Sequence, residues 1–448
     1  MTATRASETD RAKRLLSSVA DDDSAGPSAS GRQLPTRRDE IRMEIGFIHP
    51  SYPQGEGTGA VQSASRIVSE LATRGHDVTV YCRESPPETG RDHPDLSIRS
   101  LERSGYPYHT GLQLDRALRD RRAEFEAYDV VHSYVMNALP ALGEIAAETS
   151  AATVVTLNAY GGICAKNDLR YMDREPCTGN GLAKCATCSI ATSGGHDEDG
   201  MLYRSASRLG YLKLVRDGER NADRIDAYHA LSPHIRETYA DFGFPRDRLE
   251  VIPNILDDRF SRPHESDFDE PYELLYVGSL DSHKGVERLI PILAALCRRS
   301  SARFRLTVVG DGGLRSDLER QVAANGLEDA VSITGWLPNE DLPSVFAAHD
   351  MFLYPGQWDE PFGRVFLEAL ATGTPVVASD VGSVESIVAD GGRTTDGTVD
   401  GFVETVLKLL AADELESISA AAKRRAEAYR ADVVVPQLVE LYERALSR

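Results

Sequence analysis

The chain alternates between short runs of continuously apolar residues and longer amphipathic stretches. In the first half, such apolar runs lie at residues 43–49, 78–82, 129–134 and 153–157. Between the first two runs, residues 60–74 carry apolar side chains at the spacing of one helix face. Short apolar runs predict strands buried on both faces, and helices between them predict βαβ units around a parallel sheet.

The same alternation restarts in the second half of the chain. Its apolar runs lie at residues 272–278, 305–310, 330–335, 351–356 and 374–379. Two successive series of this kind predict an α/β protein with two Rossmann-like, doubly wound parallel-sheet lobes. Ligands of such sheets bind beyond the carboxyl ends of the strands, so we expect the two lobes to face a central cleft.

The expected domain boundaries follow from this pattern. The first lobe covers residues 43–245, the second covers residues 246–431, and a last helix over residues 432–448 packs back on the first lobe. Residues 1–40 are rich in Ser, Ala, Asp and Arg and have no apolar period, which predicts a disordered tail.

Composition excludes some classes of protein. The 448 residues include 50 basic and 70 acidic ones, a net charge of −20, which argues against a nucleic-acid partner. Only seven of the basic residues are Lys, a halophilic composition typical of proteins kept soluble in concentrated salt. There is neither an apolar run of spanning length nor a secretory leader, and six cysteines are few. We therefore expect a cytoplasmic protein without a transmembrane segment.

Residues 277–290 combine the end of a strand, a polar loop with Lys284, and the start of a helix. A helix N-terminus with a nearby ammonium group is a site for an anion. The alternative is an ordinary strand–helix turn with a surface lysine.

Residues 354–380 place Glu360 just before a predicted helix and Glu368 in its middle. Glu368 stands among apolar residues, and a buried carboxylate needs a partner or a ligand. The alternative partner is Arg364, four residues earlier on the same helix. Two carboxylates suit a sugar nucleotide, because they accept hydrogen bonds from neighbouring hydroxyls.

These segments together resemble the retaining glycosyltransferase family 4, which has the two-lobed GT-B fold. The matching motifs stand in the family's order over residues 43–446: TGAVQSASRIVSELATRGHDVTVY (58–81), IPN (252–254), VGSL…KG (277–285), VVGDGGL (308–314), ITGWLP (333–338) and WDEPFGRVFLEALATGTPVVASDVG (358–382). The resemblance implies transfer of a sugar from a nucleoside diphosphate sugar to an acceptor hydroxyl, with retention and without a catalytic cofactor. The acceptor would be a glycan, a lipid-linked saccharide or a small molecule.

The resemblance also implies roles for the donor-binding residues. Lys284 would neutralise the donor diphosphate, and Gly59 would let the first turn of the first lobe approach it. Glu360 and the backbone of Phe362 and Gly363 would hold the donor sugar. Glu368 would bind the ribose, and the backbone near Leu337 would receive the base.

Two positions depart from the family pattern. Ser279 stands where the family often has an arginine, so one phosphate cation is missing unless Arg364 substitutes for it. Asn158 stands where the family often has a histidine, and an amide cannot carry the charge of an imidazole. Candidate catalytic residues are therefore Glu360, Lys284, Asn158 and His132, the last with a structural histidine as the alternative.

Rival functions remain open from the sequence. They are a nucleotide-sugar epimerase or a sugar phosphorylase on the same fold, and a catalytically silent binding subunit, which Ser279 and Asn158 would favour.

Four cysteines follow the strand at residues 153–157 in the spacing C-x12-C-x7-C-x2-C: Cys164, Cys177, Cys185 and Cys188. Four thiolates form a tetrahedral metal set, so a structural Zn²⁺ is the first interpretation, with disulfides or free thiols as alternatives. A subset of the resembling family has cysteines in a comparable insertion.

Residues 201–220 predict an amphipathic helix with five basic side chains. Its ordinary interpretation is a helix of the first lobe. The alternative is a peripheral contact with the inner face of a membrane.

Overall fold

The computed structural model of the 448-residue chain describes residues 42–52, 59–83, 96–101, 110–192 and 201–448. The predicted tail over residues 1–40 lies outside the described residues.

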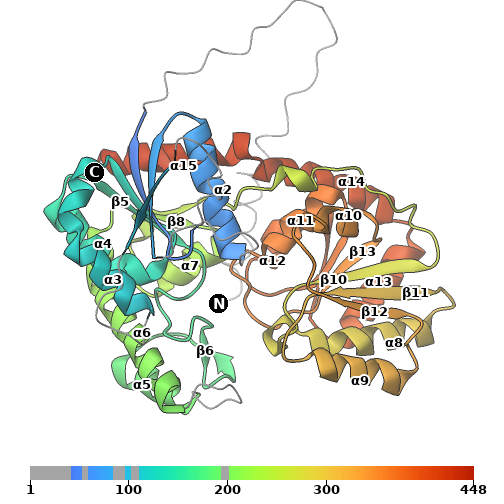
Figure 1. Ribbon diagram of the computed structural model, residues 1–448. Helices are drawn as coiled ribbons and strands as arrows, with labels where there is room; N and C mark the ends of the chain where they lie inside the picture. Colours follow the sequence, from blue (N-terminus) through green and yellow to red (C-terminus); the bar gives the residue numbers. More distant parts are fainter. Residues whose placement is uncertain (1–41, 53–58, 84–95, 102–109, 193–200) are drawn as a thin grey trace, which may run out of the picture. The chain divides into compact units, whose positions relative to one another are not determined.

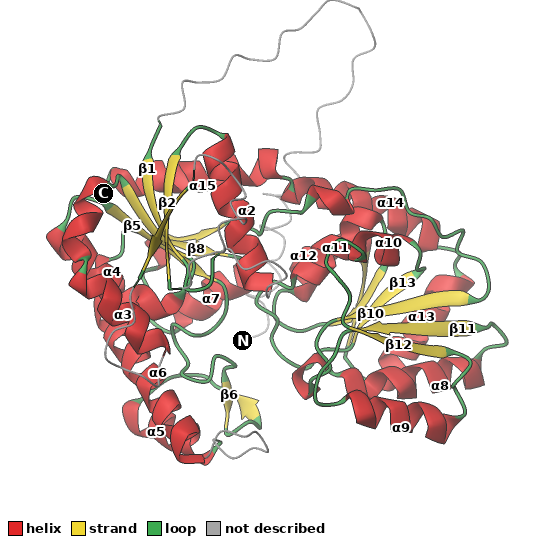
Figure 2. Cartoon of the chain, viewed as in Figure 1, coloured by secondary structure: helices red, strands yellow, loops and turns green. Residues whose placement is uncertain are grey.

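The first lobe is built on a parallel sheet of seven strands in the order β3-β2-β1-β4-β5-β8-β9 (Figures 1 and 2). The strands are β1 (Glu44–Ile48), β2 (Asp77–Cys82), β3 (Ser97–Ser100), β4 (Val130–Ser133), β5 (Ala152–Leu157), β8 (Ala227–Ala230) and β9 (Leu249–Val251). Side chains of successive residues point to opposite faces, so Val130 and Val131 enter two different hydrophobic cores. Both faces of the sheet are therefore covered.

Helices close both cores of the first lobe. The face that contains Val131 is covered by α3 (Thr110–Asp120), α4 (Leu139–Glu148) and α7 (Pro233–Asp241). The face that contains Val130 is covered by α2 (Gly59–Thr73) and by the last helix of the chain, α15 (Ala431–Leu446). α15 thus joins the first lobe although it follows the second lobe in the sequence.

The second lobe has a six-stranded parallel sheet in the order β12-β11-β10-β13-β14-β15. Its strands are β10 (Tyr272–Val277), β11 (Phe304–Val309), β12 (Val331–Gly335), β13 (Met351–Tyr354), β14 (Val376–Ser379) and β15 (Gly392–Thr395). One core contains residues of α8 (Leu289–Arg299), α9 (Arg315–Asn325) and α13 (Val399–Ala411). The other contains residues of α10 (Leu342–Ala347), α11 (Arg364–Thr372) and α12 (Val384–Val388), and α14 (Leu415–Ala426) contributes to both.

A segment between β5 and α6 (Met201–Asn221) departs from the repeating pattern, and we call residues 159–192 the cysteine insertion. It contains the antiparallel strands β6 (Arg170–Tyr171) and β7 (Glu175–Pro176) and the helix α5 (Leu182–Ala191). α5 packs against α6, which packs in turn on α4, as Figure 1 shows.

The predicted α/β fold with two doubly wound lobes is confirmed, and each apolar run named above forms a strand. The sequence missed β3, β8, β9 and β15, which have only three or four residues each. β9 pairs with β8, so the first sheet extends past the expected boundary at residues 245/246. No helix among the described residues has both the length and the apolar character needed to cross a membrane.

Candidate functional site

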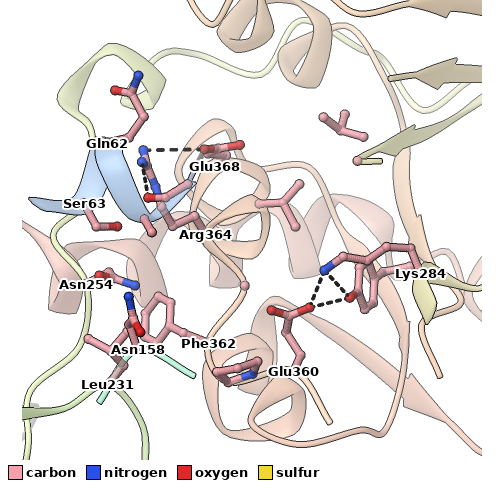
Figure 3. A pocket seen from close by; sticks show the side chains of 18 of the residues that line it. Gln62, Ser63, Asn158, Leu231, Asn254, Lys284, Glu360, Phe362, Arg364 and Glu368 are labelled. Carbon is pink, nitrogen blue, oxygen red and sulfur yellow. Dashed lines mark hydrogen bonds and ion pairs between the residues drawn. The ribbon is translucent and has the colours of Figure 1, made fainter. Parts of the chain in front are cut away.

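A pocket of about 360 Å³ lies at the carboxyl ends of strands from both lobes (Figure 3). Tyr134, Asn158 and Leu231 line it directly after β4, β5 and β8 of the first lobe. Val277 and Tyr354, the last residues of β10 and β13, line it from the second lobe. Parallel strands converge at this edge in both sheets, so the fold places the loops of both lobes around one space.

The loop after β10 brings Lys284 into the pocket. Gly285 follows it with a φ of 68°, and a Cβ there would lie 1.8 Å from the carbonyl oxygen of Pro355. Only glycine fits this close approach. Lys284 Nζ then lies 2.8 Å from Glu360 Oε2 and 3.2 Å from the hydroxyl of Tyr354.

Tyr354 and Lys284 share one carboxylate oxygen. The hydroxyl of Tyr354 donates a hydrogen bond of 2.5 Å to Glu360 Oε2. Burial and the Glu360 charge raise the pKa of Tyr354 well above its usual range, so the hydroxyl keeps its proton. The ammonium also lies 5.5 Å from the centre of the Trp358 ring. This side of the pocket therefore holds one cation and one carboxylate on an aromatic support.

The opposite side of the pocket is formed by the start of α11. Gly363 precedes the helix with a φ of 75°, and no side chain caps its first amides, so they remain available to an anion. Arg364 Nη2 lies 3.8 Å from Glu368 Oε1, and Arg364 Nη1 donates to the carbonyl oxygen of Gly59 at 3.3 Å. The alternative ion pair between Arg364 and Glu368 is thus present in the structure, and Figure 3 shows it beside Gln62.

Glu368 is buried but still lines the pocket. Burial raises the pKa of its carboxyl group, and Arg364 opposes this shift. Arg364 offsets only part of the cost of burying this negative charge, so the carboxylate favours a ligand that donates hydrogen bonds.

The pocket brings together eight of the residues expected from the sequence: Gly59, Asn158, Lys284, Glu360, Phe362, Gly363, Arg364 and Glu368. Leu337 is not among the residues that line it and instead packs, partly buried, against a core of the second lobe.

His132 lies outside the pocket, which corrects its selection as a catalytic candidate. Its side chain is fully buried in the first lobe, and its two ring nitrogens each lie 2.7 Å from a hydroxyl, that of Tyr442 and that of Thr156. Burial and the neighbouring His229 lower its pKa well below the usual range. His132 therefore belongs to the core, the structural alternative that the sequence left open.

The four cysteines of the insertion do not form a metal site in the structure, so the expected zinc site is not supported. Among the described residues, no group of three or more His, Cys, Asp or Glu side chains has the arrangement of a metal site. Cys177 Sγ instead contacts the carbonyl oxygen of Gly179 at 3.3 Å, and Cys188 Sγ accepts from the amide of Met172 at 3.2 Å. The Cys164 thiol lies 3.8 Å from the carboxylate of Asp168, and all six cysteines are free in the structure, which agrees with the free-thiol alternative.

The sequence missed several residues of the pocket. Asn254 lines it from the IPN motif and accepts a hydrogen bond of 3.1 Å from the hydroxyl of Tyr134. Gln62 and Ser63 line it from the first turn of α2, next to Gly59. The position of the IPN motif and the helical spacing from Gly59 were signals that could have identified Asn254 and Ser63.

Two domain families match the two lobes in order. Residues 58–255 match the glycosyl transferase 4-like domain, and residues 257–426 match the domain of glycosyl transferases group 1. A D-inositol 3-phosphate glycosyltransferase from Nocardia farcinica is 33% identical over 382 residues, which cover 78% of this chain and 76% of that protein. A GDP-mannose-dependent alpha-mannosyltransferase from Mycolicibacterium smegmatis is 27% identical over 401 residues, covering 87% and 94%.

Other relatives match over shorter stretches. The alpha-D-kanosaminyltransferase of Streptomyces kanamyceticus is 32% identical over 215 residues, and this chain spans 55% of that relative's length. Among solved structures, sucrose-phosphate synthase from Thermosynechococcus elongatus superposes with a TM-score of 0.66 at 19% identity, over 91% of this chain and 100% of that one.

Two Rossmann-like lobes around one pocket, with these structural relatives, define the GT-B class of fold. The chain belongs to the family of glycosyltransferases that the two matched domains describe, and it is a transferase enzyme.

Proposed function

We propose that this enzyme transfers a sugar from a nucleoside diphosphate sugar to an acceptor hydroxyl, with retention at the anomeric carbon. The observation that carries the proposal is the pair of opposed charged groups in one pocket: Lys284 with Glu360 on one side, Arg364 with Glu368 on the other. The structure of Anabaena HepE in complex with UDP-glucose, which superposes with a TM-score of 0.62, agrees with a donor of this class.

The diphosphate would lie between Lys284 and the first turn of α11. The ammonium on one side, and Arg364 with the uncapped amides of α11 on the other, supply positive charge that would stabilise the leaving group. Gly59, whose carbonyl oxygen accepts a hydrogen bond from Arg364, lines the pocket there and has no side chain to hinder close approach. Arg364 would take the place of the arginine that Ser279 replaces.

The two carboxylates would divide the rest of the donor. Glu360, with the backbone of Phe362 and Gly363, would accept hydrogen bonds from the sugar hydroxyls. Glu368 would accept those of the ribose, and the base would extend toward the backbone near Leu337.

Transfer would take place on one face of the donor sugar. The bond from the anomeric carbon to the diphosphate oxygen breaks, and its electron pair leaves with the diphosphate. The acceptor oxygen bonds to the same carbon and passes its proton to a diphosphate oxygen. The protein's contribution is then charge stabilisation and orientation of the acceptor.

The acceptor, a glycan, a lipid-linked saccharide or a small molecule, would enter from the first lobe, where Asn158 lines the pocket. The amide nitrogen of Asn158 donates to the carbonyl oxygen of Tyr134 at 3.2 Å, which fixes its orientation. Its carbonyl oxygen is then positioned to accept a hydrogen bond from the acceptor hydroxyl.

The proposal includes a peripheral membrane contact through α5 and α6. Leu182 and Ile190 on α5 and Tyr203 and Leu209 on α6 are exposed apolar side chains, and α6 carries five basic residues. Sedimentation with vesicles of phosphatidylglycerol tests this contact. Binding should fall for Leu182→Ser with Ile190→Ser but persist for Val433→Ser, an exposed valine on α15. Equal binding by all three proteins would contradict it.

The main test is a thermal-shift screen of nucleoside diphosphates, followed by transfer assays with the sugar donors of the nucleotide that stabilises the protein. We expect one nucleoside diphosphate to raise the melting temperature and its sugar donor to be consumed faster in the presence of an acceptor alcohol. Three outcomes would contradict the proposal. The sugar donor could be consumed only when free phosphate is present, the donor could be epimerised, or no nucleotide could stabilise the protein.

A further inference from the structure

The loop that carries Glu360 is bonded to the first lobe on both sides of that residue. Three hydrogen bonds join the cysteine insertion to three successive residues of this loop. Arg170 Nη1 donates to the carbonyl oxygen of Gln357 at 3.3 Å, and the Tyr160 hydroxyl donates to that of Asp359 at 2.7 Å. Between them, Trp358 Nε1 donates to the carbonyl oxygen of Asp168 at 3.2 Å. A single short loop that makes consecutive contacts with one insertion cannot move independently of it.

Contacts also follow on the other side of Glu360. Ser232 Oγ, at the start of α7 in the first lobe, donates to the carbonyl oxygen of Pro361 at 2.8 Å. The carbonyl oxygen of Glu360 itself accepts from the amide of Ser383 at 2.9 Å and from its hydroxyl at 2.8 Å. The second lobe therefore holds the backbone of Glu360, and the first lobe holds the residues on either side.

Tyr160 makes the shortest bond from the insertion. Its ring is fully buried, and its hydroxyl also lies 2.9 Å from His234 Nε2. Because the hydroxyl has one proton and donates it to Asp359, it accepts the hydrogen of His234. Tyr160 is thus fixed from its own lobe and aimed at the loop of the other lobe.

Trp358 connects this contact to the charged groups. Its ring packs edge-on against Tyr160, with centroids 5.9 Å apart, and it lies two residues before Glu360. The ammonium of Lys284 lies 5.5 Å from the centre of the same ring. A displacement of Trp358 would therefore shift both Glu360 and the surroundings of Lys284.

We propose that Tyr160 and Trp358 are positioning residues, through which the cysteine insertion of the first lobe holds the Glu360 carboxylate of the second lobe in place for the donor sugar. This inference rests on the proposed function for the part that concerns the sugar. The bond network on its own is independent of that function.

The first test is hydrogen–deuterium exchange of the peptide spanning residues 354–363 in the ligand-free enzyme. Its amide at Gln357 is bonded to the carbonyl oxygen of His283 at 3.0 Å and reports on loop opening. We expect Tyr160→Phe to exchange about fivefold faster in this peptide, the effect of one hydrogen bond. The matched control is Tyr228→Phe, which removes a buried bond of 2.9 Å to the carbonyl oxygen of Ala222 within the first lobe.

The second test separates positioning from a merely structural role. Calorimetry with UDP, UDP-glucose, GDP and GDP-mannose gives the ratio of affinities for a sugar donor and for its nucleotide. Tyr160→Phe should weaken the donor about fivefold and change the bare nucleotide by less than about twofold. Trp358→Phe, which keeps a ring but loses the indole N–H, should act in the same direction.

The two tests fail in different ways. A parent enzyme that no nucleoside diphosphate stabilises in the thermal-shift screen contradicts the proposed function, whatever the exchange result. Unchanged exchange in both Tyr160→Phe and Trp358→Phe overturns the positioning by the insertion. Faster exchange with an unchanged ratio of affinities overturns the link from the insertion to the donor sugar.

Discussion

The ammonium of Lys284 and the carboxylate of Glu360 form an ion pair of 2.8 Å inside the pocket, although both residues are proposed to contact the donor. Both side chains are largely buried, with 21% and 9% of their surfaces exposed. A buried pair of this kind is costly to break by removing one partner, because the other charge stays uncompensated. In the unliganded enzyme, the pair therefore keeps the two proposed donor-binding groups in place, and a bound diphosphate and sugar would replace it.

Lys284→Ala should nearly abolish transfer, with a loss on the order of 3 kcal/mol or more of transition-state stabilisation. The variant removes the charge beside the proposed diphosphate and leaves Glu360 with Tyr354 alone. Lys284→Arg should retain part of the activity. Steady-state kinetics at fixed salt give kcat/KM for each protein, and Lys408→Ala is the control, because Lys408 is exposed in a helix-surface pair. Activity of Lys284→Ala within a few-fold of the parent would contradict this role.

Glu368→Gln should weaken nucleoside diphosphate binding about tenfold, because one carboxylate acceptor of the ribose becomes an amide. The fold should survive. Burial raises the pKa of Glu368 above its unfolded value of 4.5, so stability falls as the pH rises from that value through the folded pKa. The neutral amide removes this cost. Calorimetric titration and thermal melting measure the two effects. Glu385→Gln, at an exposed position of α12, is the control. Lost stability with unchanged affinity would favour a purely structural pair with Arg364.

Asp257 links the two lobes and should make stability depend on acid. Burial alone would raise its pKa, but hydrogen bonds from Arg259 and the charge of Arg66 on α2 outweigh burial and lower the pKa to about 2. A lowered pKa means that its stabilisation is present above the unfolded value near 4 and is lost as the pH falls toward 2.

Asp257→Asn should therefore cost about 2 kcal/mol at pH 7, and the difference from the parent should shrink below pH 4. Urea unfolding at several pH values measures it. The neighbouring Asp258→Asn, which changes an exposed side chain, should show no such difference at any pH. A cost that is constant with pH would mean that Asp257 acts through packing.

The cysteines of the insertion should have unequal effects on stability. Cys188 is buried and accepts a hydrogen bond from Met172, whereas Cys185 is only half-buried. Cys188→Ala should cost about 1 kcal/mol, and Cys185→Ala should cost less. Chemical unfolding with and without a chelator measures both. The metal-site interpretation would regain support if both variants lost the same free energy of unfolding and the chelator also destabilised the parent protein.

The residues that could be predicted from the sequence share a local signal. Glu360 and Glu368 are eight positions apart around one helix start, and Lys284 follows a strand end, so the position of each in the pocket follows from its own segment. Tyr160 carried no such signal, because its partner Asp359 is 199 residues away. His132 and the cysteines are candidates only because of their residue type. Whether such a side chain is buried depends on partners far away in the sequence, such as Tyr442 on the last helix for His132.

Ser279→Arg should be tolerated and should tighten binding of the bare nucleoside diphosphate. Ser279 is exposed beside Gly278, which lines the pocket, and only its carbonyl oxygen is bonded, to the hydroxyl of Tyr276 at 2.9 Å. The new side chain therefore breaks no bond. Lys284 and Arg364 each already have a carboxylate partner, so an added guanidinium would contribute charge that neither carboxylate offsets.

The gain for Ser279→Arg should be roughly fivefold at low salt and should shrink as salt screens the added charge. It should be equal for the nucleoside diphosphate and for its sugar donor, because only the diphosphate is contacted. Ser332→Arg adds the same charge on the exposed face of β12 and serves as the control. Calorimetric titration over a series of salt concentrations measures both variants. Equal gains for the two arginines would indicate a general effect of net charge. A loss confined to Ser279→Arg would mean that the diphosphate does not lie beside this loop, and the role proposed for Lys284 would fail with it.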